Sequence, residues 1–163
     1  MMPMLPAHAA HEASSAAAVY LVSCAAQKAA QRERAADLYQ SDWFRKARTY
    51  VEAIGCRWFI LSAEHGLLDP GAHIDPYDTT HAMMSAAERR LWGTRVADQL
   101  DKALGADYAG EIVFLAGKHY RAPLLDYAGK RARVPMIGLG IGQQKAWLAA
   151  RIVEAGGKGR PGP

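Results

Sequence analysis

Side chains able to do acid–base and hydrogen-bonding chemistry are concentrated in the segment "SAEHGLLDPGAHIDPYD", from Ser62 to Asp78. His65 can exchange a proton near neutral pH, and a carboxylate such as Asp78 can orient water or stabilise a developing positive charge. Ser62 can both donate and accept a hydrogen bond. The segment directly follows the apolar run "WFIL", so it forms either a long surface loop or one wall of a ligand site.

The motif "IDPYD" offers an aromatic ring between two carboxylates. Pro76 fixes its own φ angle and disfavours a helical Asp75, so Tyr77 is presented from a stiff loop. A ring beside carboxylates suits a flat heterocycle, which the ring stacks on while a carboxylate positions water. The alternative is an Asp-Pro turn with a packed tyrosine.

Four short apolar runs are predicted to be strands, and helical patterns separate them. Each run is apolar nearly throughout, which is typical of strands covered on both faces. Alternating strands and helices predict an α/β fold, namely a three-layer α/β/α sandwich with a mostly parallel four-stranded sheet. The predicted strands are residues 19–24, 57–63, 111–117 and 134–140, and the predicted helices are 41–55, 85–105, 122–130 and 142–155.

The chain is expected to form one domain over residues 19–155, with a disordered leader (1–18) rich in Ala, Ser and Pro and a disordered tail (156–163). Ser41 is a predicted helix N-cap and Gly55 a predicted helix stop. Ser85 and Glu88 have the spacing of a capping box.

In parallel α/β sheets, ligands bind beyond the carboxyl ends of the strands. Every predicted strand here ends in glycines or in polar, reactive side chains. The glycine turn before Gln143 could cradle an anion at a helix start or simply pack a helix against the sheet. Lys28, Lys118 and Arg121 could hold phosphate or could be solvated surface. The predicted contact residues are Ser23, Cys24, Lys28, Ser62, Tyr77, Lys118, His119, Tyr120, Arg121, Gly140, Gly142 and Gln143.

Composition and motifs exclude several classes of protein. The net charge of +4 is compatible with nucleic acid without demanding it. No apolar run is long enough for a membrane span, and the leader lacks signal-peptide features, so a cytoplasmic protein without membrane contact is expected. Cys24 and Cys56 form no CxxC pair, and no Walker A, GxSxG or HExxH motif occurs. We predict no metal and no cofactor; the oligomeric state stays open.

The order of several motifs resembles a widespread group of small bacterial and phage proteins of unknown function. These motifs are "LVSC" followed by Lys28, "DLYQSDWFRKARTYVEA", "WFILSAEHGLLDP", "IDPYD", "LAGKHYRAPL" and "GLGIGQQKAWL". One departure is Ala25-Ala26, where that group often has a lysine or glycine. The chain is also similar to domains that accompany 7-deazaguanine transglycosylases, and its sheet looks like the uracil-DNA glycosylase architecture. That superfamily carries an Asp-Pro-Tyr loop after its first strand, whereas Asp75-Pro76-Tyr77 follows the second.

The resemblance implies an enzyme that acts on the N-glycosidic bond of a nucleobase, with excision of a modified base from DNA as the favoured reaction. Asp75 or Asp78 would be the catalytic carboxylate, and His65 would contact the leaving base or a phosphate. Tyr77, helped by Tyr120, would stack on the flipped base. Two alternatives stay open: a glycohydrolase or base exchanger on free nucleotides, and a non-catalytic nucleic-acid-binding module.

Overall fold

Five strands form one mixed sheet in the order β4-β3-β1-β6-β7. The computed structural model describes residues 18–159. Within it, β1 pairs in parallel with β3 and β6, β6 pairs in parallel with β7, and β4 is antiparallel to β3. The predicted α/β class with a mostly parallel sheet is therefore confirmed. The bounds are β1 (Val19–Ser23), β3 (Arg57–Ser62), β4 (Gly66–Leu68), β6 (Ile112–Leu115) and β7 (Ala132–Arg133).

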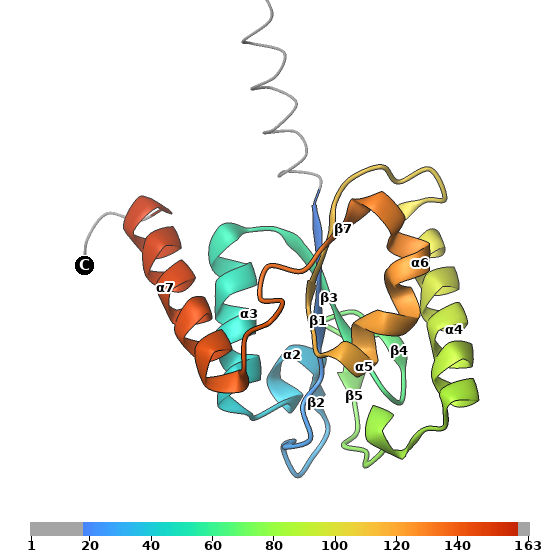
Figure 1. Ribbon diagram of the computed structural model, residues 1–163. Coiled ribbons are helices and arrows are strands. Elements are labelled where there is room, and N and C mark those ends of the chain that lie inside the picture. The colour runs from blue at the N-terminus through green and yellow to red at the C-terminus, as the bar shows by residue number, and fades with distance from the viewer. Residues whose placement is uncertain (1–17, 160–163) are drawn as a thin grey trace, which may run out of the picture.

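Helices cover both faces of this sheet (Figure 1). One face carries α2 (Ala35–Leu38), α3 (Asp42–Ile54) and α7 (Ile141–Gly159), and the other carries α4 (Ala86–Leu104), α5 (Lys118–Arg121) and α6 (Leu125–Ala128). Residues 18–159 also contain three short 3-10 helices: η1 (His81–Met83), η2 (Ala122–Leu124) and η3 (Gly129–Arg131).

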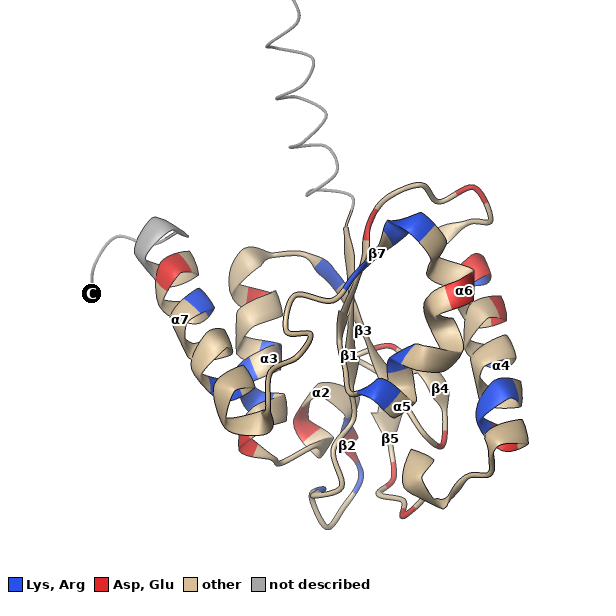
Figure 2. Ribbon diagram, viewed as in Figure 1, with Lys and Arg blue, Asp and Glu red and all other residues tan. Residues whose placement is uncertain are grey.

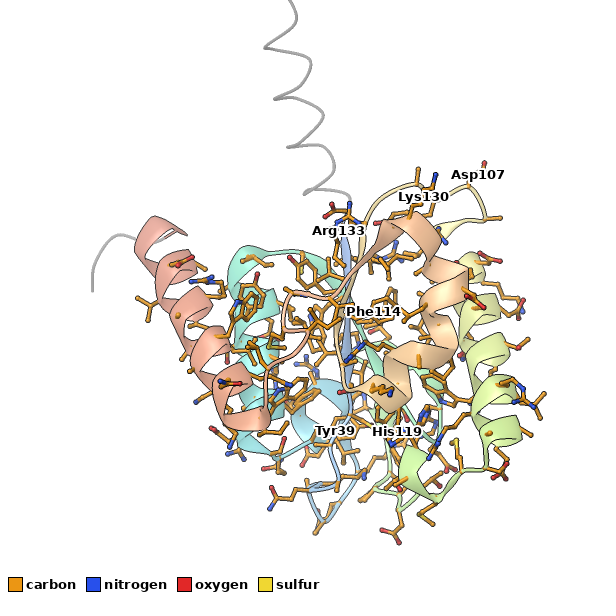
Figure 3. The ribbon with its side chains drawn as sticks, in the orientation of Figure 1. Tyr39, Asp107, Phe114, His119, Lys130 and Arg133 are labelled. Atoms are coloured by element: carbon orange, nitrogen blue, oxygen red, sulfur yellow. The ribbon has the colours of Figure 1, made fainter. Side chains whose placement is uncertain are left out.

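Neighbouring strand residues point to opposite faces, and both faces are apolar. Val22 and Leu115 pack with α3 and α7, whereas Leu21 and Phe114 (Figure 3) pack with α4. All four side chains are buried. This double burial explains why the strand sequences are apolar throughout rather than alternating.

The predicted helix signals of α3 and α4 are confirmed. The Phe44 N–H donates to the Ser41 hydroxyl at 3.0 Å, and α3 ends at Gly55, whose φ of 68° is left-handed. Ser85 and Glu88 form the capping box at the start of α4.

The predicted fourth strand, residues 134–140, is wrong. Those residues form turns, and the fourth parallel strand is the two-residue β7 just before them. Pro135 has no N–H to give to a strand ladder, and Gly138 has a φ of 83°, which is incompatible with extended backbone. The glycines that follow are thus not at a strand end.

Two predicted helices also differ in extent. The expected helix over 122–130 is divided into η2, α6 and η3, with a break at Gly129, where φ is 55°. Helix α7 continues through residues 156–159, which the sequence assigned to the tail. The leader, apart from residue 18, and the last four residues lie outside the described part of the chain.

The antiparallel edge strand β4 was not predicted. The chain turns back after β3 through Gly66, which has a φ of 75°. The Gln99 side chain of α4 then holds the outer side of this strand. It accepts from the Leu67 N–H at 2.8 Å and donates to the His65 carbonyl at 3.3 Å.

A two-stranded antiparallel ribbon joins two loops at the carboxyl edge of the sheet. It consists of β2 (Glu33–Arg34), which lies in the connection after β1, and β5 (His73–Ile74), which follows β4. The Arg32 guanidinium reinforces the ribbon by donating to the His73 carbonyl at 3.0 Å. The ribbon fixes where the Asp75-Pro76-Tyr77 loop begins.

Candidate functional site

Three hydroxyl groups meet beneath the Asp75-Pro76-Tyr77 loop. The Tyr77 hydroxyl lies 2.5 Å from the Tyr39 hydroxyl and 2.7 Å from the Ser62 hydroxyl. Ser62 also accepts from the His65 N–H at 2.9 Å. We call Tyr39, Ser62 and Tyr77 the hydroxyl triad. Ser62 ends β3, and Tyr39 follows α2, so the triad ties the Tyr77 loop to two separate connections.

The triad is neutral at physiological pH. Burial raises the pKa of both the Tyr39 and the Tyr77 hydroxyl above the ordinary tyrosine value. Two hydrogen bonds join three hydroxyls, so one hydroxyl hydrogen has no partner within the triad.

The ring of Tyr77 is surrounded by functional groups that the sequence predicted. The Lys28 ammonium lies 4.4 Å from the ring centroid, and the His65 ring packs edge-on at 5.4 Å. A cation over a tyrosine face is attracted by the ring quadrupole. Tyr77, Lys28, His65 and Ser62 are therefore brought together, as expected.

A polar hollow of about 400 Å³ opens beside Tyr77, a size at the small end of ligand pockets. Asp75 lies on its rim, is 73% exposed and pairs with Arg32 at 3.2 Å. Glu64 accepts a 2.5 Å hydrogen bond from the Thr79 hydroxyl. The hollow is lined by Arg32, Glu64, His65, His73, Ile74, Asp75, Pro76 and Tyr77.

A second cluster lies between the ends of β1 and β6. The Cys24 thiol is 3.2 Å from the Tyr120 hydroxyl, and the Tyr120 ring stacks on His81 with centroids 4.1 Å apart. The Trp92 ring meets His81 edge-on, and its N–H donates to the Ser62 carbonyl at 2.9 Å. The cluster therefore contacts the hydroxyl triad through Ser62. One face of the Tyr120 ring is covered by the His81 ring. This disagrees with the expectation that Tyr120 helps to stack on a base.

His81 is 1% exposed and is held neutral. Burial, with a smaller effect of Arg89, lowers its pKa to about 4 although its Nδ1–H donates to the His119 carbonyl at 2.9 Å. Its Nε2 atom is buried and has no hydrogen-bond partner among the described residues.

Other predicted residues lie apart from the hollow. Asp78 is exposed, and no hydrogen bond or ion pair of its side chain occurs within residues 18–159. Ser23 is buried at the end of β1. The Arg121 guanidinium donates to the Ala116 carbonyl at 2.9 Å. Lys118 and His119 are exposed on α5.

The glycine turn is satisfied internally. The Gln143 carboxamide accepts from the Gly140 N–H at 3.0 Å, which occupies a donor that an anion would need. The next residue, Gln144, accepts from the Trp43 indole at 2.8 Å and so joins α7 to α3. Gly142 and Gln143 are exposed at the start of α7, and a Cβ atom at Gly142 would meet nothing within 4 Å.

Sequence reasoning missed Arg32, Tyr39, His73 and His81 as parts of the site. Arg32 and His73 are brought together by the pairing of β2 with β5, and no local sequence pattern predicts this pairing. Tyr39 lies in the motif "DLYQ", but its partner Tyr77 is 38 residues away. In the described residues, no three His, Cys, Asp or Glu side chains are grouped so that they could hold a metal ion.

The fold and site define a small α/β protein with a polar hollow at the carboxyl edge of its sheet. Residues 19–150 match the family of unknown function DUF6884, and the chain belongs to this family. The match carries no link to glycosylases. A comparison with curated proteins finds no match. None of the helices within residues 18–159 is both long and apolar enough to cross a membrane.

Proposed function

We propose that this protein cleaves the N-glycosidic bond of a nucleobase in DNA, with the hollow beside Tyr77 as the base site. The observation that carries the proposal is the position of Asp75 and Tyr77 together on the wall of a hollow of about 400 Å³. A pocket of this size and polarity suits a flat ligand rich in hydrogen-bonding groups.

The β2–β5 ribbon supports the resemblance to uracil-DNA glycosylases. In sequence, Asp75-Pro76-Tyr77 follows the second strand of the parallel sheet rather than the first. In space, the ribbon sets this loop against the connection that follows β1, because Arg32 pairs with Asp75 and Lys28 covers Tyr77. The reaction is assigned from the site residues rather than from the likeness of fold.

The proposal gives roles to four residues that line the hollow and to Lys28, which covers the Tyr77 ring. Asp75 orients the attacking water and stabilises the positive charge that develops on the sugar. Arg32 pairs with that carboxylate at 3.2 Å and fixes its position on the rim. Tyr77 offers its ring to the base, and Lys28 leaves the ring face as the base arrives and then contacts a phosphate. His65 contacts the leaving base.

Between the two carboxylates of the motif, the structure favours Asp75. Asp75 lines the hollow, whereas Asp78 is not among the residues that line it. Glu64 also lines the hollow, but its carboxylate is engaged with Thr79. We therefore assign the water-orienting role to Asp75 and no step to Asp78.

The test is to incubate the full chain with DNAs that carry different modified bases, and to measure released base by mass spectrometry together with abasic sites. We expect Asp75→Asn to lower release from the accepted DNA by about 100-fold or more, since general-base and electrostatic groups contribute factors of this size. Asp126→Asn on α6 is the matched control, because Asp126 is an exposed carboxylate of the other helical layer. Full activity of Asp75→Asn would refute the assignment.

A second candidate is hydrolysis or base exchange on free nucleotides. The hollow favours it in one respect: besides the carboxylates, its lining carries three basic side chains, Arg32, His65 and His73. Of these, Arg32 and His73 can bind a phosphate within the same site. Release of base from nucleotides but from none of the DNAs would select this candidate. A chain that binds DNA and releases base from neither substrate would be the non-catalytic binding module.

A further inference from the structure

A second concave surface lies on the α4 side of the sheet, between the start of α4 and the segment α5–η2. It encloses about 400 Å³. Its floor is apolar and consists of Ala86, Ala122 and Pro123. We call this surface the basic groove, because its remaining lining residues are Arg89, Arg90, Lys118 and His119.

No carboxylate lines the basic groove. In the described part of the chain, Arg90 and Lys118 form no ion pair. Cations elsewhere on the surface commonly do, for example Arg48 with Asp37 at 2.7 Å and Lys102 with Asp98 at 3.1 Å. The positive charge of the groove is thus uncompensated, and like charges held together destabilise a surface unless an anion binds there.

One of these cations is also held in place. The Arg89 Nε–H donates to the His81 carbonyl at 3.0 Å, which fixes the guanidinium next to the groove. Its other N–H groups make no hydrogen bond within residues 18–159 and can reach a ligand. A guanidinium positioned in advance loses less conformational entropy when it binds a phosphate oxygen.

The basic groove and the hollow lie at the same end of the molecule. Figure 2 shows basic positions of α5 and α4 toward the end where β1, β3 and β6 finish. In Figure 3, His119 of the groove and Tyr39 of the hydroxyl triad lie at this end, and Lys130 and Arg133 lie at the other. The cluster of His81, Trp92 and Tyr120 connects the two regions. The His81 ring donates to the His119 carbonyl, and the Trp92 indole donates to the carbonyl of Ser62 in the hydroxyl triad.

We propose that the basic groove binds the sugar–phosphate backbone of the DNA strand whose base enters the hollow. The cations contact successive phosphates, and the apolar floor packs against a deoxyribose. Such contacts position a strand without reading its sequence. This inference rests on the proposed function. It adds that the substrate is a polynucleotide rather than a free nucleotide.

The experiment measures binding of the full chain to a fluorescein-labelled single-stranded oligonucleotide by anisotropy, over a series of NaCl concentrations. The groove variant is the double substitution Arg90→Gln with Lys118→Gln. The matched control is Lys102→Gln with Lys130→Gln, which removes the same charge at a distance from the groove. Both pairs are exposed, and the melting temperature of each variant shows that it is folded.

We expect the groove variant to weaken oligonucleotide binding by about tenfold and to reduce the slope of log K against log [salt] by about 1 to 1.5, because each phosphate contact on a single strand contributes about 0.7. The control should change affinity by less than about twofold. Equal weakening in both variants would overturn the proposal, as would equally tight binding of a polyglutamate peptide.

Failure of the proposed function gives a different result. If the groove variant binds DNA weakly as expected but no base is released by the unmodified chain, the groove assignment holds and the glycosylase assignment fails. If free nucleotides are hydrolysed and the two double variants bind oligonucleotide alike, the hollow assignment holds and the groove assignment fails.

Discussion

The hollow beside Tyr77 and the basic groove are similar in volume, about 400 Å³ each, but they differ in how their charges are arranged. In the hollow, Arg32 neutralises Asp75 and Thr79 holds Glu64. In the groove, Arg90 and Lys118 have no acidic partner among the described residues. The charged side chains of the hollow are therefore paired within the chain. The cations of the groove keep a positive charge that an anionic ligand can neutralise.

This difference teaches which kind of ligand each surface suits. Internal pairing fixes side chains in one geometry, which favours a small ligand bound in a defined orientation. Unpaired cations on an open surface attract an extended anion and do so more weakly as salt screens them. The substitutions below act on the layer between the two surfaces, then on the groove and last on the hollow.

The largest effect on stability is expected on lowering the pH, and it is expected to come from His81, which lies between the two surfaces. Its pKa is lowered to about 4 in the folded chain against an ordinary value of about 6.5. The unfolded chain therefore takes up a proton first as the pH falls. Stability from this group is complete above pH 6.5 and is lost as the pH drops toward 4. The expected loss in the free energy of unfolding is about 3 kcal/mol.

Denaturant unfolding of the unmodified chain and of His81→Phe between pH 4 and pH 7.5 checks this expectation. Phenylalanine keeps a ring between Tyr120 and Trp92 but cannot titrate. His81→Phe should be less stable at pH 7, because the His119 carbonyl loses its donor, and should show a flatter pH dependence. An unchanged slope would mean that other groups cause the acid sensitivity.

The second-largest loss of stability is expected from a substitution of Gly93, where α4 crosses η2. A Cβ atom at this position would lie 2.7 Å from both the Cβ and the carbonyl oxygen of Pro123. Because Pro123 forms part of the groove floor, Gly93→Ala should push η2 away from α4. We expect a loss of about 2 kcal/mol in the free energy of unfolding, together with weaker oligonucleotide binding. Nucleotide binding in the hollow should be unchanged.

Gly142→Ala is the matched control for Gly93→Ala. A Cβ atom at Gly142 would meet nothing within 4 Å, and alanine in a helix is favoured over glycine by up to about 1 kcal/mol. Thermal unfolding should show an unchanged or raised melting temperature. Loss of ligand binding in Gly142→Ala would show instead that the glycine turn binds an anion. The hollow and the groove would then not be the only two ligand surfaces to compare among the described residues.

The smallest effect is expected at Tyr39. Tyr39→Phe keeps the ring contact with Phe44, whose centroid is 5.1 Å away, and removes one hydroxyl of the triad. We expect a loss of about 1 kcal/mol in stability and weaker ligand binding in the hollow, with groove binding unchanged. Tyr127→Phe, which removes the 2.7 Å hydrogen bond to Asp101, should cost similar stability without either binding effect.

The sequence predicted the parts of the fold that depend on local pattern. The apolar runs at Val19, Arg57 and Glu111 became β1, β3 and β6, and the caps at Ser41 and Ser85 formed as expected. Local pattern failed where two signals competed. The run after Val134 is apolar, but Pro135 and Gly138 prevent a strand, and the chain uses the preceding two residues instead.

The sequence pointed to several residues of the candidate site, but it did not predict which of them contact one another. Ser62, His65, Lys28 and Tyr77 meet because strand ends converge at one edge, which is a rule of the fold. The partners Arg32 and Tyr39 could not be found in the same way. Their contacts with Asp75 and Tyr77 span 43 and 38 residues and depend on the pairing of two-residue strands. Such short strands carry no periodic signal in the sequence.

The contact of Gln99 with β4 bears on how copies of this protein can meet. An edge strand with free main-chain groups is a template for another chain to add a strand. Here the Leu67 N–H and the His65 carbonyl are already bonded to the Gln99 carboxamide, and the opposite edge strand, β7, has only two residues. Neither border of the sheet offers a run of free backbone. Within residues 18–159, addition of a strand at either border of the five-stranded sheet, and with it sheet-to-sheet growth into fibres, is therefore disfavoured for as long as α4 stays folded against β4.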